Sequence, residues 1–306
     1  MELHPQVRAI VEAAAAEAGE EVPPDLEALR ASYLDTALRL GGAAEPVAAV
    51  EEIVIPRDDG GRLRAKSYRP QVPAQPLGAL VWLHGGGWVV GDLAGFDHVA
   101  RALANASGAV VVTVEYRLAP EDRFPAALRD ARAGVAWALR DGGAQLGTEA
   151  GLVAVGGDSA GGNLAAAAAL HARELRAQLL VYPALDARMD SDSYRELAED
   201  PVLPARYMAR CWEAYLGGSD GEDPDASPLL AADLGGAPPA FVAVARDVLR
   251  DDGLRYAEAL RAAAVPVELQ DYGDMVHGFL RWGGVADRAR ELIDALGAFA
   301  RARLSG

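Results

Sequence analysis

The sequence is poor in cysteine and histidine, the side chains from which disulfides and many transition-metal sites are built. Cys211 is the one cysteine among 306 residues, which excludes an intramolecular disulfide and suits a reducing compartment such as the cytoplasm. It lies in an apolar helical stretch, where we expect it to serve packing. The five histidines form no cluster with metal-ligand spacing, and no phosphate-binding glycine loop is present. We therefore expect neither a metal nor a cofactor.

Basic charge and long apolar runs are also scarce. The chain has 29 Lys and Arg against 45 Asp and Glu, and this formal net charge of −16 argues against nucleic acid and anionic membrane surfaces as partners. No apolar run is long enough for a signal-peptide core or a membrane span, so we expect no stable membrane association and a cytoplasmic location. The 51% apolar content suits one large α/β domain with a small accessory region, and a homodimer is left open.

A serine stands between two glycines directly after a strand-like run. Leu152-Val153-Ala154-Val155 indicates a buried parallel strand, Gly157-Asp158-Ser159-Ala160-Gly161 follows it, and residues 163–173 are rich in helix-forming alanine and leucine. On such a turn the serine hydroxyl is pushed out over the sheet edge, and a Cβ at either glycine would collide with the neighbouring strand or helix. This pattern is typical of the nucleophile elbow of α/β-hydrolases and indicates Ser159 as the nucleophile.

A run of three glycines lies upstream, after another apolar strand. His84-Gly85-Gly86-Gly87-Trp88 follows Ala79-Leu80-Val81-Trp82-Leu83, so backbone N–H groups without side chains stand at a strand end. Such donors can stabilise the negative oxygen that forms when a serine attacks an ester carbonyl, and each is typically worth about 10²–10³ in rate. We expect the N–H groups of Gly86 and Gly87, with Gly85 as a further candidate, to join that of Ala160 in an oxyanion hole.

Several motifs together resemble a known family. The motifs are His84-Gly85-Gly86-Gly87, Tyr116-Arg117-Leu118-Ala119-Pro120-Glu121, Gly157-Asp158-Ser159-Ala160-Gly161-Gly162 and His277-Gly278-Phe279. In this order they are similar to the bacterial hormone-sensitive-lipase family of carboxylesterases, over about residues 45 to 300. The resemblance implies an α/β-hydrolase fold of class α/β, with a mostly parallel central sheet flanked by helices and a helical cap. It also implies a serine carboxylesterase acting on a small-molecule ester.

The general base is chosen by elimination. A serine needs a base, normally histidine, and in α/β-hydrolases that histidine follows the nucleophile in the chain. His171 and His277 are the two that do. His171 lies twelve residues along the elbow helix, about 18 Å away at the usual helical rise, and cannot reach the serine. His277, in a glycine-flanked loop after a strand, is the expected base.

The acid must lie between Ser159 and His277, where thirteen aspartates qualify by order. Asp247 follows the buried strand Ala240 to Ala245, and one helix–strand unit separates it from His277, so both would lie at the same sheet edge. Asp251 and Asp252 are rivals that better fit N-capping and helix-dipole roles. The family places its acid in Asp-Pro-Leu-x-Asp-x-Gly, which resembles Asp247 to Gly253 except that valine replaces the proline. We expect Asp247 to be the acid.

Alternating strands and helices define the expected organisation. A hairpin is expected over 51–68, and further strands are expected over 79–83, 109–115, 151–155, 178–182, 239–245 and 265–272, the pattern of a mostly parallel sheet. Helical periodicity covers 4–18 and 24–40. In the family such helices form part of the cap, which implies a cap segment at 1–45. Residues 46–306 would form the catalytic domain, with a second cap insertion at about 186–216.

Residues around these motifs are candidates for the substrate pocket, since ligand sites are mostly apolar. The candidates are Trp88, Tyr194, Met208, Trp212 and Phe279. The sequence fits an ordinary core position for each of them equally well. Asp158, beside the nucleophile, is expected to bond nearby backbone and brace the elbow. The pair Arg281-Trp282 receives no role from the sequence.

Taken together, these features predict a serine carboxylesterase that hydrolyses short- to medium-chain esters through an acyl-enzyme. Two alternatives use the same residues: an amide hydrolase resembling a deacetylase or formamidase, and a non-catalytic small-ligand receptor. The receptor is disfavoured because Ser159 and His277 are both present.

Overall fold

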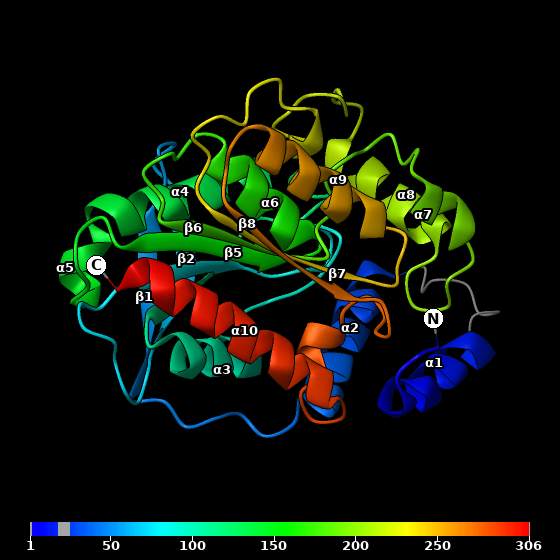
Figure 1. Ribbon diagram of the computed structural model, residues 1–306, viewed down its shortest axis with the longest axis horizontal. Helices are drawn as coiled ribbons and strands as arrows, with labels where there is room; N and C mark the ends of the chain where they lie inside the picture. Colours follow the sequence, from blue (N-terminus) through cyan, green and yellow to red (C-terminus); the bar gives the residue numbers. More distant parts are fainter. Residues whose placement is uncertain (1, 18–24, 306) are drawn as a thin grey trace.

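The computed structural model describes residues 2–17 and 25–305. Its centre is an eight-stranded sheet in the order β1-β2-β4-β3-β5-β6-β7-β8 (Figure 1). The strands are β1 (Ala49–Pro56), β2 (Arg62–Arg69), β3 (Ala79–Leu83), β4 (Val110–Val114), β5 (Val153–Asp158), β6 (Ala177–Val181), β7 (Ala240–Ala245) and β8 (Val267–Tyr272). Every strand expected from the sequence is present, with ends that differ by a few residues.

The strands pair antiparallel at one edge of the sheet and parallel in the rest of it. β1 and β2 form an antiparallel hairpin, β2 pairs antiparallel with β4, and the ladders from β4 through β8 are all parallel. The five strands β3 to β7 are buried at every position, which explains their unbroken apolar runs, because a parallel strand covered on both faces has no solvent side. The predicted mostly parallel sheet is confirmed.

Helices cover both faces of the sheet. In Figure 1, α3 and α10 lie below the sheet, and α4, α6 and α9 lie above it. Two hydrophobic clusters correspond to these layers, one on each face. The bounds of these helices and of the short α5 beside them are α3 (Asp97–Ser107), α4 (Ala126–Arg140), α5 (Gly142–Leu146), α6 (Ala160–Ala169), α9 (Arg250–Ala262) and α10 (Asp287–Leu304).

Further helices gather at the end of the sheet where β7 finishes (Figure 1). They are α1 (Pro5–Glu17), α2 (Leu26–Gly41), α7 (Asp192–Glu196) and α8 (Ala205–Leu216), and two short 3₁₀ turns are η1 (Pro228–Leu230) and η2 (Phe279–Arg281). Both N-terminal helices were expected; residues 1, 18–24 and 306 lie outside the described residues. The division into a cap and a catalytic domain stays a prediction. No described helix is long and apolar enough to span a membrane.

The turn from β5 into α6 requires its glycines. A Cβ on Gly157 would lie 2.3 Å from the Gly161 carbonyl oxygen, and one on Gly161 would lie 2.0 Å from the Leu83 oxygen at the end of β3. Between them Ser159 has φ 56°, a backbone conformation that is strained for any residue other than glycine. Close packing of α6 on β3 therefore positions the serine at the tip of the turn.

Adding one methyl group at this contact should be severely destabilising. We expect Gly161→Ala to lower the free energy of unfolding by about 3 kcal/mol or more, since the backbone of β3 has no room to move away. Urea denaturation would measure it. Gly283→Ala is the control, because a Cβ there approaches no atom closer than 3.4 Å. Equal stability of the two variants would contradict the packing described.

Candidate active site

Three side chains from separate loops form a continuous hydrogen-bonded chain. His277 Nε2 lies 2.9 Å from Ser159 Oγ, and His277 Nδ1 lies 2.7 Å from Asp247 Oδ2. With the proton on Nδ1, the imidazole donates to the carboxylate and accepts from the serine hydroxyl. The structure thus brings together the serine, the histidine and the aspartate that the sequence selected. This geometry is that of a nucleophile, its base and the group that orients the base.

The sheet places these loops next to one another. Asp247 follows β7 and His277 follows β8, and the two strands are parallel neighbours whose carboxyl ends meet at one edge. Asp247 is fully buried, and its Oδ1 accepts a hydrogen bond of 2.9 Å from the Leu249 N–H. Burial raises the pKa of Asp247 above its ordinary value, and His277 opposes this by its charge and hydrogen bond. The carboxylate therefore depends on these partners to stay ionised in its buried position.

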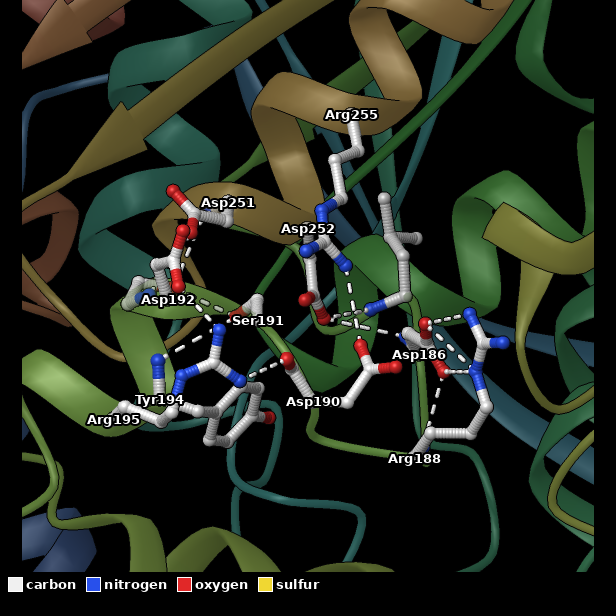
Figure 2. A network of polar contacts seen from close by, with 12 residues as sticks. Asp186, Arg188, Asp190, Ser191, Asp192, Tyr194, Arg195, Asp251, Asp252 and Arg255 are labelled. Carbon is white, nitrogen blue, oxygen red and sulfur yellow. Dashed lines mark hydrogen bonds and ion pairs between the residues drawn. The ribbon is translucent and has the colours of Figure 1, made fainter.

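The two other candidates for the acid, Asp251 and Asp252, accept backbone hydrogen bonds away from His277 (Figure 2). Asp252 is 1% exposed and accepts the backbone N–H groups of Leu185 (2.9 Å) and Asp186 (3.2 Å), while Asp251 accepts that of Ser193 (2.9 Å). Both lie inside the first turn of α9, whose N-cap residue makes no side-chain cap bond, so the expected capping role is wrong. Asp252 connects α9 to the segment that precedes α7, and Asp251 connects it to α7 itself. Their position in the first turn of α9 agrees with the expected helix-dipole role.

The glycine loop is held by the aspartate beside the nucleophile. Asp158 Oδ1 accepts a hydrogen bond of 3.0 Å from the Gly85 N–H, which confirms the expected bracing role of Asp158. Because that N–H already donates to Asp158, it does not point at an oxyanion. The expectation that Gly85 is a further oxyanion-hole donor is therefore wrong. The N–H groups of Gly86, Gly87 and Ala160 donate to no backbone acceptor among the described residues. Burial raises the pKa of Asp158 to about 6, and the charge of Arg281 opposes the rise.

The first residue of the loop is structural. His84 is buried and stacks on Tyr116 with ring centroids 4.3 Å apart, and the Tyr116 hydroxyl donates to the His84 carbonyl oxygen at 2.7 Å. Burial lowers the pKa of His84 to about 4, so the ring is neutral near pH 7. This histidine therefore anchors the glycine loop to Tyr116, in the segment that follows β4.

Comparison with known proteins agrees with this geometry. The family profile of the α/β-hydrolase fold matches residues 80–281. Esterase LipI of Mycobacterium tuberculosis is 42% identical over 233 residues, which are 73% of this chain and 72% of LipI. Carboxylesterase NlhH of the same organism is 40% identical over 256 residues, 80% of each chain. The solved structure of a hyperthermophilic esterase from Pyrobaculum calidifontis covers 100% of both chains with a TM-score of 0.92 at 38% identity.

The chain belongs to the hormone-sensitive-lipase family of carboxylesterases. The family places it in the α/β-hydrolase fold, so this part of the sequence-based prediction is confirmed.

A cavity of about 570 Å³ opens over the serine of this family member. Ser159, His277, Gly86 and Gly87 line it, and so do side chains of α1, α2 and α8. The remaining wall is mostly apolar and includes Ile10, Leu40, Val90, Val202, Leu203, Met208, Cys211 and Trp282. Burial raises the pKa of the Cys211 thiol to about 12, so this side chain acts as a small apolar group. A largely apolar cavity with few polar groups is typical of a small-molecule site.

Of the five expected wall residues, only Met208 lines this cavity. Trp88, Tyr194, Trp212 and Phe279 are each at most 4% exposed and lie outside its lining. Trp88 stacks on Tyr215 with ring centroids 4.4 Å apart. These four aromatic side chains point into the core, so their expected pocket role is corrected.

Several residues that line the cavity were not predicted from the sequence, although their spacing along two helices could have indicated them. Tyr33, Thr36 and Leu40 line the cavity from α2, and Tyr207 and Cys211 line it from α8. Their spacings of three and four residues place each set on one helical face. Arg281 and Trp282 had no such signal, because they lie on a 3₁₀ turn and the residue after it.

The buried carboxylate of Asp252 should make stability depend on pH. Burial raises the pKa of Asp252 well above its usual value, so the unfolded chain loses this proton at lower pH than the native protein does. The contribution of Asp252 to wild-type stability should therefore fall as pH rises from about 4 through its native pKa. Asp252→Asn lacks this loss and keeps an acceptor oxygen, so its stability relative to wild type should improve with pH.

Urea unfolding of wild type and Asp252→Asn at pH 5 and pH 8 would test this prediction. Asp251→Asn is the matched control, since it makes the same change in a less buried side chain one residue earlier. A stability difference between wild type and Asp252→Asn that is the same at both pH values would contradict the prediction.

Proposed function

We propose that this protein hydrolyses short- to medium-chain carboxylic esters through an acyl-enzyme. As a member of its family it is a carboxylic-ester hydrolase. The observation that carries the mechanism is the hydrogen-bonded chain from Ser159 through His277 to Asp247, at the wall of an apolar cavity. We also propose that it acts in the cytoplasm, which suits its single cysteine.

The reaction begins when His277 Nε2 takes the proton of Ser159 Oγ as the oxygen attacks the ester carbonyl carbon. The carbonyl oxygen becomes negative, and the N–H groups of Gly86, Gly87 and Ala160 donate to it. His277 then gives its proton to the leaving alcohol, which leaves the acyl group on the serine. Water enters, loses a proton to His277 and releases the carboxylic acid by the same steps.

Asp247 acts on the histidine and not on the substrate. Its carboxylate accepts from Nδ1, which keeps the other ring nitrogen free to accept the serine proton. When the imidazole becomes cationic, the nearby negative charge stabilises it. Full burial of Asp247 keeps this interaction away from water, where it would be weaker.

The size of the cavity supports a limited acyl length. At about 570 Å³ it lies within the usual range for small-molecule sites, roughly 300–1,000 Å³. Side chains of helices α1, α2 and α8 form part of its wall. A space of this size takes the acyl and alcohol parts of a small ester and leaves little room for a long chain.

Removing the nucleophile should abolish most of the activity. We expect Ser159→Ala to lower the turnover of p-nitrophenyl butyrate by roughly 10⁴–10⁶, and Asp247→Asn to lower it somewhat less, because its effect passes through His277. Steady-state kinetics measure both. Asp251→Asn is the control and should stay within a few-fold of wild type. An inactive Asp251→Asn beside a normal Asp247→Asn would show that the acid is misassigned.

Chain-length preference is the second expected outcome. Across p-nitrophenyl esters from acetate to palmitate, kcat/KM should peak at short to medium chains because longer chains exceed the cavity. A peak at palmitate would contradict the proposal, and so would faster turnover of a matched anilide than of the ester.

A further inference from the structure

Arg281 is a buried cation in the wall of the active-site cavity. It ends the 3₁₀ turn η2 that follows the histidine loop, it is 8% exposed, and it lines the same cavity as Ser159. A Cβ built on Gly278, the residue after the base, would lie 3.5 Å from Arg281 Nη2. The guanidinium therefore lies close to the catalytic histidine loop.

Aromatic rings hold this guanidinium in place, and no described side chain forms an ion pair with it. Its Cζ lies 4.1 Å from the centre of the Tyr33 ring and 5.7 Å from that of Phe96, so two aromatic faces position it. Nε and Nη1 are enclosed and have no hydrogen-bond partner among the backbone and side chains that the structure describes, whereas Nη2 is not enclosed and is the nitrogen left for a ligand. Among the side chains of residues 2–12 and 25–305, no carboxylate lies within 4.0 Å of it. A buried charge normally has both an ionic partner and satisfied hydrogen bonds.

Asp158 does not fill that place. It shares the cavity wall with Arg281, but no ion pair joins the two side chains, and its Oδ1 accepts the Gly85 N–H. The other charged side chain in the lining is Arg39 of α2, a second cation. Among the described side chains, and apart from the catalytic histidine, the cavity thus presents two guanidinium groups and one carboxylate, whose Oδ1 accepts from the glycine loop and whose charge interacts with Arg281.

We propose that Arg281 binds a carboxylate group carried by the ester substrate, so that the preferred substrates are esters with a free acid group. The inference rests on the proposed ester hydrolysis and names its substrate class. A carboxylate is the natural partner of a planar guanidinium, which gives it a charge-assisted hydrogen bond. Because Ser159 and Arg281 line one cavity, a single small molecule can place its ester carbonyl at the serine and its acid group at the arginine.

Matched esters that differ only in charge test the proposal. Monoethyl glutarate carries the acid on the acyl side, and ethyl glutaramate is its neutral carboxamide; O-butyrylglycolate and O-butyrylglycolamide place the same groups on the alcohol side. We expect wild type to prefer the carboxylate over the carboxamide by about tenfold or more in kcat/KM for at least one pair. The pair that shows the preference identifies which side of the ester faces Arg281.

Substitution of the arginine should remove that preference. Arg281→Gln should lower the carboxylate-to-carboxamide ratio at least tenfold, and Arg281→Lys should restore part of it. Arg303→Gln, with the same charge change on an exposed helix end, is the control and should leave the ratio as in wild type. Because Arg281→Gln could fail to fold, wild-type inhibition provides a second measurement: glutarate should compete with p-nitrophenyl butyrate at least tenfold more strongly than glutaramide.

The contrary outcomes are distinct. No carboxylate preference in either pair overturns the inference while leaving the esterase in place. An equal loss on both esters in Arg281→Gln also overturns it and makes Arg281 a structural counter-charge to Asp158. Absence of Ser159-dependent turnover of p-nitrophenyl butyrate would instead overturn the proposed function itself, and the inference with it.

Discussion

The close crossing of α6 and the end of β3 is the contact on which the rest of the site depends. Gly157 and Gly161 allow it, since a Cβ at either position would lie within 2.3 Å of a backbone oxygen. The crossing places Ser159 at a positive φ on the tip of the turn and brings the turn against the glycine loop that leaves β3. Asp158 then joins turn and loop by one hydrogen bond. The nucleophile and the oxyanion donors are therefore held in a fixed relative position, which is the geometry that transition-state stabilisation requires.

Buried carboxylates connect the loops around this unit. Asp158, Asp247 and Asp252 are each at most 1% exposed, and each accepts at least one backbone N–H from a residue outside regular strands. Burial of a carboxylate is costly unless such donors are supplied, so each of these side chains restricts the loop that it bonds. Arg281 is the opposite case, because its Nε and Nη1 find no acceptor among the described residues. This contrast separates charges that hold the scaffold from one left for a ligand.

Sequence reasoning succeeded where the chemistry is local. The glycines at 157 and 161 and the strand–turn–helix around Ser159 follow from backbone sterics, and His277 followed by elimination. It failed where side-chain direction decides the outcome. Trp88 directly follows the glycine loop and Trp212 is next to Cys211 of the cavity wall, yet the two rings pack against each other in the core, whereas Arg281 lines the cavity. The predicted N-capping role of Asp251 and Asp252 is wrong, while their predicted place at the start of a helix is right, because the backbone groups that they bond, at Ser193 and Leu185, are more than fifty residues away in sequence.

The sequence by itself determined the parallel sheet, the elbow and the set of residues from which the nucleophile and base were chosen. Strand periodicity and glycine sterics depend on residues that are close together in the chain. The small number of histidines leaves few candidates for the base. Tertiary structure alone decided which glycine N–H remains free, which apolar residues face the cavity, and that a buried guanidinium lies in its wall with no ion pair to a described side chain. These features depend on contacts between segments that are far apart in the chain. The energy of a buried polar group is determined by the groups that surround it in space and not by its neighbours in sequence.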